Sequence, residues 1–89
     1  MTEEVVTLLS DTETQPTPGM RAAMMAAEVG DEQKNEDPTV RLLQDRVSEL
    51  LGKECALWLP SGTMCNLVAV KSQTRPGDAV VADWMAHVI

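Results

Sequence analysis

The chain has 89 residues and a formal net charge of −7, because 14 acidic side chains stand against 7 basic ones. No basic stripe is present, which excludes a nucleic-acid partner, and no apolar run approaches the roughly 18 residues that span a bilayer. Since the N-terminus also lacks the basic start and apolar core of a signal peptide, the composition predicts a cytoplasmic protein without membrane partners.

The first third of the chain predicts one helix. Residues 5–9 are β-branched and apolar, which fits either a short strand or an extended arm. Thr17 is a candidate N-cap, and Pro18 is the first helical residue, where its missing N–H costs nothing. We expect the helix to continue through the Ala- and Met-rich run 20–28, and Gly30 to close it.

A second helix starts from a stronger signal of the same kind. After the polar loop 31–36, Asp37 supplies an acidic cap and Pro38 an N1 proline. Apolar residues then recur at helical spacing, with charged residues on the other face: Val40, Leu43, Val47, Leu50 and Leu51. Gly52 is the predicted C-terminal stop.

The remainder of the chain alternates strand-like and helical segments. Residues 55–59 form an unbroken apolar run of strand length, typical of a buried parallel strand. A helix is predicted from about Gly62 to Gln73, followed by a turn over 74–78 and a second buried strand over 79–82. The order strand, helix, strand with short connections predicts an α/β architecture.

Residues 61–63, which we call the phosphate turn, predict an anion site. Ser61, Gly62 and Thr63 open the last helix, where free backbone N–H groups and the helix dipole suit a phosphate. Gly62 lets the backbone approach the anion closely, and the two hydroxyls can donate further hydrogen bonds. The alternative is that Ser61 only caps the helix.

The two cysteines, Cys55 and Cys65, lie on either side of the phosphate turn. They have neither CxxC spacing nor a nearby histidine, so they indicate apolar packing and not a metal site or a disulfide.

Two further residues have both a structural and a functional interpretation. His87 is the only histidine, and it follows the strand predicted over 79–82, at the edge where ligands gather in α/β sheets. Ser10 is followed by Asp11 and Thr12, and these residue types readily bond their own backbone in a turn. Residue type alone favours the structural interpretation of both.

Several motifs stand in one order along the chain: Leu8-Leu9-Ser10-Asp11-Thr12, Pro16-Thr17-Pro18, Gly30-Asp31, Glu36-Asp37-Pro38-Thr39, Pro60-Ser61-Gly62-Thr63-Met64 and Ala86-His87. In this order they resemble the N-terminal portion of the low-specificity L-threonine aldolases, within the aromatic amino acid β-eliminating lyase/threonine aldolase family. The resemblance runs from about Leu8 to Ile89. Those enzymes use pyridoxal phosphate (PLP) and have the aspartate aminotransferase fold. The resemblance therefore implies the N-terminal part of the large α/β domain of a fold type I enzyme.

The resemblance also implies a reaction and the roles of four residues. The reaction is that of a carbon–carbon lyase, which cleaves the Cα–Cβ bond of β-hydroxy-α-amino acids and converts L-threonine or allo-threonine to glycine and acetaldehyde. Gly62 and Thr63 match the family's phosphate-binding motif. His87 matches a histidine that stacks on the cofactor ring and could take or relay the β-hydroxyl proton. Ser10 matches a serine that helps to hold the substrate carboxylate. The implied full-length protein is a homo-oligomer, a dimer or a tetramer, and no metal is expected.

Residues 30–38 depart from the family pattern. They are Gly-Asp-Glu-Gln-Lys-Asn-Glu-Asp-Pro, where the family commonly has Gly-Asp-Asp-Val-Tyr-Gly-Glu-Asp-Pro. Lys34 replaces a tyrosine, which leaves the substrate side chain open and keeps a phenylserine aldolase or a β-eliminating amino acid lyase as alternatives. Asn35 replaces a glycine, and since asparagine tolerates a positive φ, we expect the turn to survive.

None of the lysines matches the lysine that forms the Schiff base with PLP in the family. Lys34, Lys53 and Lys71 do not stand in the family's Ser-Lys motif, which comes far downstream. We therefore expect residues 1–89 to be an incomplete N-terminal fragment of the domain that is inactive alone. The competing hypothesis is a non-enzymatic remnant or a partner-binding fragment, and the coding region after Ile89 distinguishes the two.

Overall fold

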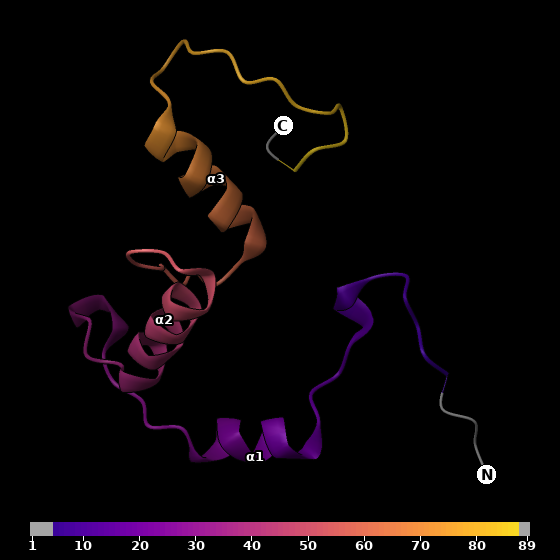
Figure 1. Cartoon of the computed structure of the whole chain (residues 1–89), viewed down its shortest axis with the longest axis vertical. Helices are drawn as coiled ribbons and strands as arrows, with labels where there is room; N and C mark the ends of the chain where they lie inside the picture. The colour runs from indigo at the N-terminus through magenta and orange to yellow at the C-terminus, as the bar shows by residue number, and fades with distance from the viewer. Residues whose placement is uncertain (1–4, 88–89) are drawn as a thin grey trace. The chain divides into compact units, whose positions relative to one another are not determined.

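Helices make up the regular structure of residues 5–87, the part of the chain that the computed structural model describes (Figure 1). In chain order they are the 3-10 helix η1 (Asp11–Glu13), α1 (Pro18–Ala26), the 3-10 helix η2 (Glu32–Lys34), α2 (Pro38–Leu51) and α3 (Gly62–Gln73). The chain divides into two units, Met1–Thr39 and Val40–Ile89. None of the described helices is long and apolar enough to cross a membrane.

Helix α1 begins where the sequence predicts but ends earlier. Thr17 is its N-cap: Oγ1 of Thr17 accepts the N–H of Met20 at 3.2 Å, and Sδ of Met20 accepts the N–H of Thr17 at 3.5 Å. Pro18 takes the first helical position. The C-cap is Ala27, so the expectation that Gly30 closes the helix is wrong. Gly30 is instead required by the geometry of the loop that follows.

The loop between α1 and α2 is closed by hydrogen bonds between its two ends. Gly30 donates its N–H to Oδ2 of Asp37 at 3.1 Å, and Thr39 donates its hydroxyl to the carbonyl of Glu28 at 2.6 Å. A Cβ on Gly30 would lie 2.7 Å from the carbonyl carbon of Glu36, closer than real Cβ contacts. Only glycine fits this close approach of two backbone segments.

The middle of this loop is η2, which is bounded by polar caps. Asp31 is the N-cap, and its Oδ1 accepts the N–H of Gln33 at 3.1 Å. Asn35 ends η2 in the left-handed conformation, with φ 58° and ψ 37°, which confirms that asparagine preserves the turn. Nζ of Lys34 lies 3.8 Å from Oδ2 of Asp31, an exposed ion pair that contributes little to stability.

Helices α2 and α3 have the predicted boundaries. Helix α2 begins at Pro38 and ends at Leu51. Gly52 follows at φ 62°, the left-handed conformation that glycine adopts after a helix. Helix α3 spans Gly62–Gln73, as predicted. Each of these boundaries depends on residues within a turn of it, so local sequence is sufficient to set them.

The structure differs from the two predicted strands. Segments 55–59 and 79–82 are irregular, residues 5–9 are irregular too, and no strand occurs anywhere within residues 5–87 (Figure 1). A strand needs a neighbouring strand to exchange backbone hydrogen bonds with. No such neighbour is present in the described part of the chain, so the α/β layering stays a prediction.

Side chains that the sequence predicts to be buried are exposed in this structure. No residue between 5 and 87 is buried. Leu57 is 68% exposed and Val81 is fully exposed, although both lie in predicted strands. Cys55 and Cys65 are exposed free thiols, not packed apolar residues. Because apolar side chains in water contribute no free energy of burial, these faces form a core only when further apolar surface covers them.

Candidate cofactor-binding site

The N-terminus of α3 holds backbone donors that the helix itself does not use. Ser61 is the N-cap, with φ −144° and ψ 148°: its Oγ accepts the N–H of Met64 at 3.1 Å, and its carbonyl accepts the N–H of Cys65 at 3.1 Å. The N–H groups of Gly62 and Thr63 come too early in the helix to have an intrahelical acceptor. The interpretation of Ser61 as a helix cap is therefore confirmed, and two donors of the phosphate turn are left for another partner.

These two donors fit a phosphate group. Apart from its chain neighbours and the backbone of its own helix, no heavy atom lies within 4 Å of the position that a Cβ on Gly62 would take, so an anion can approach the backbone there. Thr63 adds a hydroxyl next to the two N–H groups, and the helix dipole adds partial positive charge. The residues present thus match the requirements of the PLP phosphate, and the assignment of Gly62 and Thr63 to it stays a prediction.

His87 directly follows a turn that Asp83 organises. The carbonyl of Asp83 accepts the N–H of Ala86 at 2.9 Å, and its Oδ1 accepts the N–H of Met85 at 2.9 Å. The side chain of His87 is exposed. Within residues 5–87, no hydrogen bond joins it to the phosphate turn, and its roles in stacking and proton transfer stay predictions.

Ser10 belongs to the first unit and caps η1. Its Oγ accepts the N–H of Thr12 at 3.2 Å, and the Oγ atoms of Ser10 and Thr12 lie 2.9 Å apart. Oγ of Ser10 also donates to Oδ1 of Asp11 at 3.5 Å. The interpretation of these residues as a hydrogen-bonded turn is confirmed, while the contact of Ser10 with a substrate carboxylate stays a prediction.

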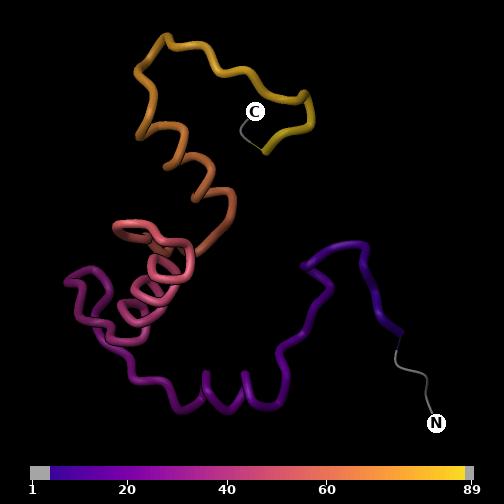
Figure 2. The backbone as a smooth tube through the Cα atoms, viewed as in Figure 1, coloured from indigo at the N-terminus to yellow at the C-terminus, as the bar shows by residue number. Residues whose placement is uncertain are grey.

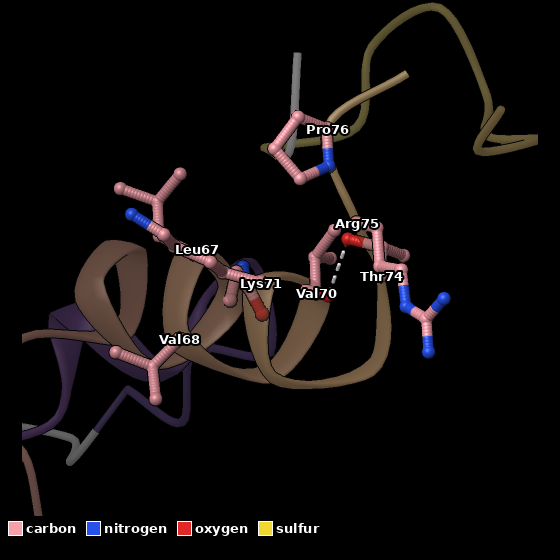
Figure 3. A pocket seen from close by; sticks show the side chains of 8 residues that line it. Leu67, Val68, Val70, Lys71, Thr74, Arg75 and Pro76 are labelled. Carbon is pink, nitrogen blue, oxygen red and sulfur yellow. Dashed lines mark hydrogen bonds between the residues drawn. The ribbon is translucent and has the colours of Figure 1, made fainter. Parts of the chain in front are cut away.

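One surface feature is not evident from the sequence: a pocket of about 610 Å³ on the C-terminal half of α3. Figure 3 shows side chains of α3 and of the turn after it around this pocket, where the hydroxyl of Thr74 donates to the carbonyl of Val70 at 2.9 Å. The residues that line it are Asn66, Leu67, Val68, Val70, Lys71, Thr74, Arg75 and Pro76. None of the predicted site residues is among them. Among them, Asn66, Val70 and Thr74 are four residues apart, the spacing of one helix face.

Comparison with known proteins identifies the family. Residues 7–89 match the family described as beta-eliminating lyase, and the chain belongs to that family. It is 48% identical over 83 residues to the low specificity L-threonine aldolase of Escherichia coli strain K12, an alignment that covers 93% of this chain and 25% of that protein. It is 50% identical over 80 residues to low-specificity L-threonine aldolase 1 of Arabidopsis thaliana, covering 88% and 22%. Against the low specificity L-threonine aldolase of Saccharomyces cerevisiae it is 37% identical over 82 residues, covering 91% and 21%.

The chain spans about a quarter of the length of the curated relatives that it matches. The family assignment confirms the resemblance that the ordered motifs predict. It also supports the class of fold type I enzymes, and enzymes of this family use PLP.

Proposed function

We propose that this chain is the N-terminal part of a PLP-dependent aldolase that cleaves the Cα–Cβ bond of β-hydroxy-α-amino acids. L-threonine or allo-threonine would give glycine and acetaldehyde. The observation that carries the proposal is the 48% identity, across 93% of the chain, to a protein named low specificity L-threonine aldolase. The chain would supply the start of the large α/β domain of a fold type I enzyme, in which segments 55–59 and 79–82 would be buried strands of the sheet.

Gly62 and Thr63 hold the cofactor phosphate in this proposal. Their N–H groups have no intrahelical acceptor, whereas the next N–H, that of Met64, is already bonded to Ser61. When bound, PLP supplies an electron sink for the electron pair that the broken bond leaves on Cα. By holding the phosphate, the phosphate turn would fix the position of the cofactor relative to the substrate, and this is its contribution to the reaction.

His87 and Ser10 act on the ring and on the substrate. Cleavage removes the β-hydroxyl proton as the C–O bond becomes the aldehyde carbonyl, and Cα is then protonated to give glycine. The imidazole of His87 stacks on the cofactor ring and takes or relays the hydroxyl proton. The hydroxyl of Ser10 helps to hold the substrate carboxylate through a charge-assisted hydrogen bond.

We place the lysine that binds PLP covalently outside these 89 residues, because Lys34, Lys53 and Lys71 do not stand in the family's Ser-Lys motif. Lys34 pairs with Asp31 in the loop between α1 and α2, and Lys71 lines the pocket on the C-terminal half of α3. The proposal assigns the covalent lysine to the remainder of the enzyme. That enzyme acts in the cytoplasm as a homo-oligomer.

The test is aldehyde release by the enzyme that contains this chain. The purified holoprotein should release acetaldehyde from L-threonine or allo-threonine, or benzaldehyde from phenylserine if Lys34 has changed the substrate preference. It should also show the visible absorbance of lysine-bound PLP. The 89-residue chain should do neither. Aldehyde release by the short chain, or none by the holoprotein from any of the three amino acids, would contradict the proposal.

A further inference from the structure

A side chain of α2 holds the backbone of the segment that leads into the phosphate turn. Oε1 of Gln44 accepts the N–H of Trp58 at 2.9 Å, across fourteen residues of sequence. Because a backbone N–H is a donor, only the oxygen of the Gln44 amide can face it. Gln44 is half-buried, in a unit where most side chains are exposed. This bond therefore connects α2 to segment 55–59 through a contact that the local sequence does not predict.

A small pocket adjoins the bond between Gln44 and Trp58. This pocket is lined by Leu43, Gln44 and Val47 from α2 and by residues 56–58 from the segment that follows it. Figure 2 shows the chain turning back beside the C-terminal part of α2 before it enters α3. Trp58 is 41% exposed where its neighbour Leu57 is 68% exposed, so Trp58 is the better covered of the two. The bond itself is exposed to solvent, so it rests on its geometry and on the half-buried position of Gln44.

The anchored residue lies close to the phosphate turn along the chain. Only Leu59 and Pro60 separate Trp58 from Ser61. The ring of Pro60 fixes one of the backbone angles of this connection, and Ser61 is held by its own hydrogen bond to Met64. Fixing the backbone at Trp58 therefore restricts where the free N–H groups of the phosphate turn can lie.

We propose that Gln44 is a positioning residue for the phosphate turn. It ties Trp58, in the segment that leads into α3, to α2, so that Gly62 and Thr63 present their donors in one place before the cofactor binds. Donors that are already ordered lose less conformational freedom on binding an anion, which raises the affinity. The proposal rests on the proposed function, because it takes the PLP phosphate as the anion.

The test uses the enzyme that contains this chain and the variant Gln44→Leu, which removes the acceptor. In the cofactor-free protein, amide hydrogen exchange at Trp58 and over residues 62–64 should become faster. The dissociation constant for PLP should rise about 2- to 10-fold, the loss expected for one hydrogen bond. The dissociation constant for pyridoxal, which has no phosphate, should stay unchanged.

Two further variants separate positioning from general stability. Gln44→Glu keeps an acceptor oxygen at the same distance from the backbone, and it should restore slow exchange at Trp58. Gln73→Leu makes the same change as Gln44→Leu at the exposed end of α3 and should alter neither exchange nor PLP affinity. If Gln44→Leu does not fold, Gln44→Asn can replace it, because it keeps the amide but is one methylene too short to reach Trp58. Gln44→Asn should likewise show faster exchange and a higher dissociation constant for PLP.

Three results would overturn the proposal. The first is unchanged exchange at Trp58 and over 62–64 in Gln44→Leu or Gln44→Asn. The second is an equal loss of affinity for PLP and pyridoxal, which would mean that the substitution damages the site generally. The third is a loss of thermal stability without any change in PLP affinity. An enzyme that binds no PLP before mutation would contradict the proposed function instead, and the exchange measurement alone would then decide whether Gln44 orders the turn.

Discussion

The loop between α1 and α2, bounded by Glu28 and Thr39, and residues 74–87 after α3 are two connecting segments that differ in how their hydrogen bonds are satisfied. The first is closed by its own side chains, because Asp37 accepts the N–H of Gly30 and Thr39 donates to Glu28. The second has local bonds at its two turns, such as that from the N–H of Arg75 to Oδ2 of Asp78 at 2.8 Å. The run 79–82 between those turns has no strand partner within residues 5–87.

The comparison between the two segments shows which parts of a fold can form from local interactions alone. A segment whose hydrogen-bond partners lie within about a dozen residues takes its shape from its own side chains. A segment whose partners belong to another strand leaves its apolar side chains in water, as the fully exposed Val81 illustrates. We therefore expect substitutions in 74–87 to change stability or activity only in the assembled enzyme. Substitutions in 28–39 should instead destabilise the loop between α1 and α2 itself.

The largest expected effect is a loss of turnover on substitution of His87, at the end of segment 74–87. In the holoenzyme, His87→Phe keeps much of the stacking area but removes the proton acceptor. PLP binding should change little, while turnover falls by the ~10²–10⁴-fold typical of losing a positioned acid–base group. PLP absorbance and single-turnover rates measure the two effects separately. If His87→Ala changed neither, the residue would lie outside the site.

The next effect tests whether 79–82 becomes a buried strand in the enzyme. Val81→Asp places a carboxylate where the proposed sheet would be packed, so the assembled enzyme should lose about 3 kcal/mol or more in free energy of unfolding. In the 89-residue chain the same side chain already lies in water, and helix content by circular dichroism should not change. Equal stability of the assembled enzyme with and without Val81→Asp would show that this segment is not a buried strand.

A smaller effect tests the closed loop. Gly30→Ala forces a Cβ against the backbone of Glu36, so the free energy of unfolding of the enzyme should fall by about 1–3 kcal/mol. Gly19→Ala is the matched control: its Cβ would meet nothing closer than Oγ1 of Thr17 at 3.9 Å within α1, and it should be neutral or stabilise by up to about 1 kcal/mol. Chemical denaturation of both variants checks this. Similar values for the two would mean that the loop does not need its close approach.

The sequence predicts the helices well because their starts and stops are local. Thr17 caps α1 and Ser61 caps α3, each with the hydrogen bond that its position predicts. The left-handed Asn35 is predicted for the same reason, since its side chain tolerates that conformation. Gly30 is misinterpreted as a helix stop because its real constraint is the backbone of Glu36, six residues away.

The candidate site could be predicted in part only. The spare donors of Gly62 and Thr63 follow from Ser-Gly-Thr at a helix start. The roles of His87 and Ser10 depend on resemblance, because no local pattern fixes where a turn lies relative to the cofactor. Gln44 gave no signal in the sequence, since its partner is a backbone N–H fourteen residues away.

The central claim is that the phosphate turn binds the PLP phosphate, and paired dissociation constants for PLP and pyridoxal test it most directly. In the enzyme that contains this chain, Gly62→Asp adds a side chain and a negative charge where the phosphate should lie, and Gly62→Asn adds a side chain of the same shape without the charge. PLP affinity should fall by orders of magnitude in Gly62→Asp and by less in Gly62→Asn, while pyridoxal affinity stays the same in both. Unchanged retention of PLP by Gly62→Asp after dialysis would contradict the claim and leave residues 61–63 as a helix cap only.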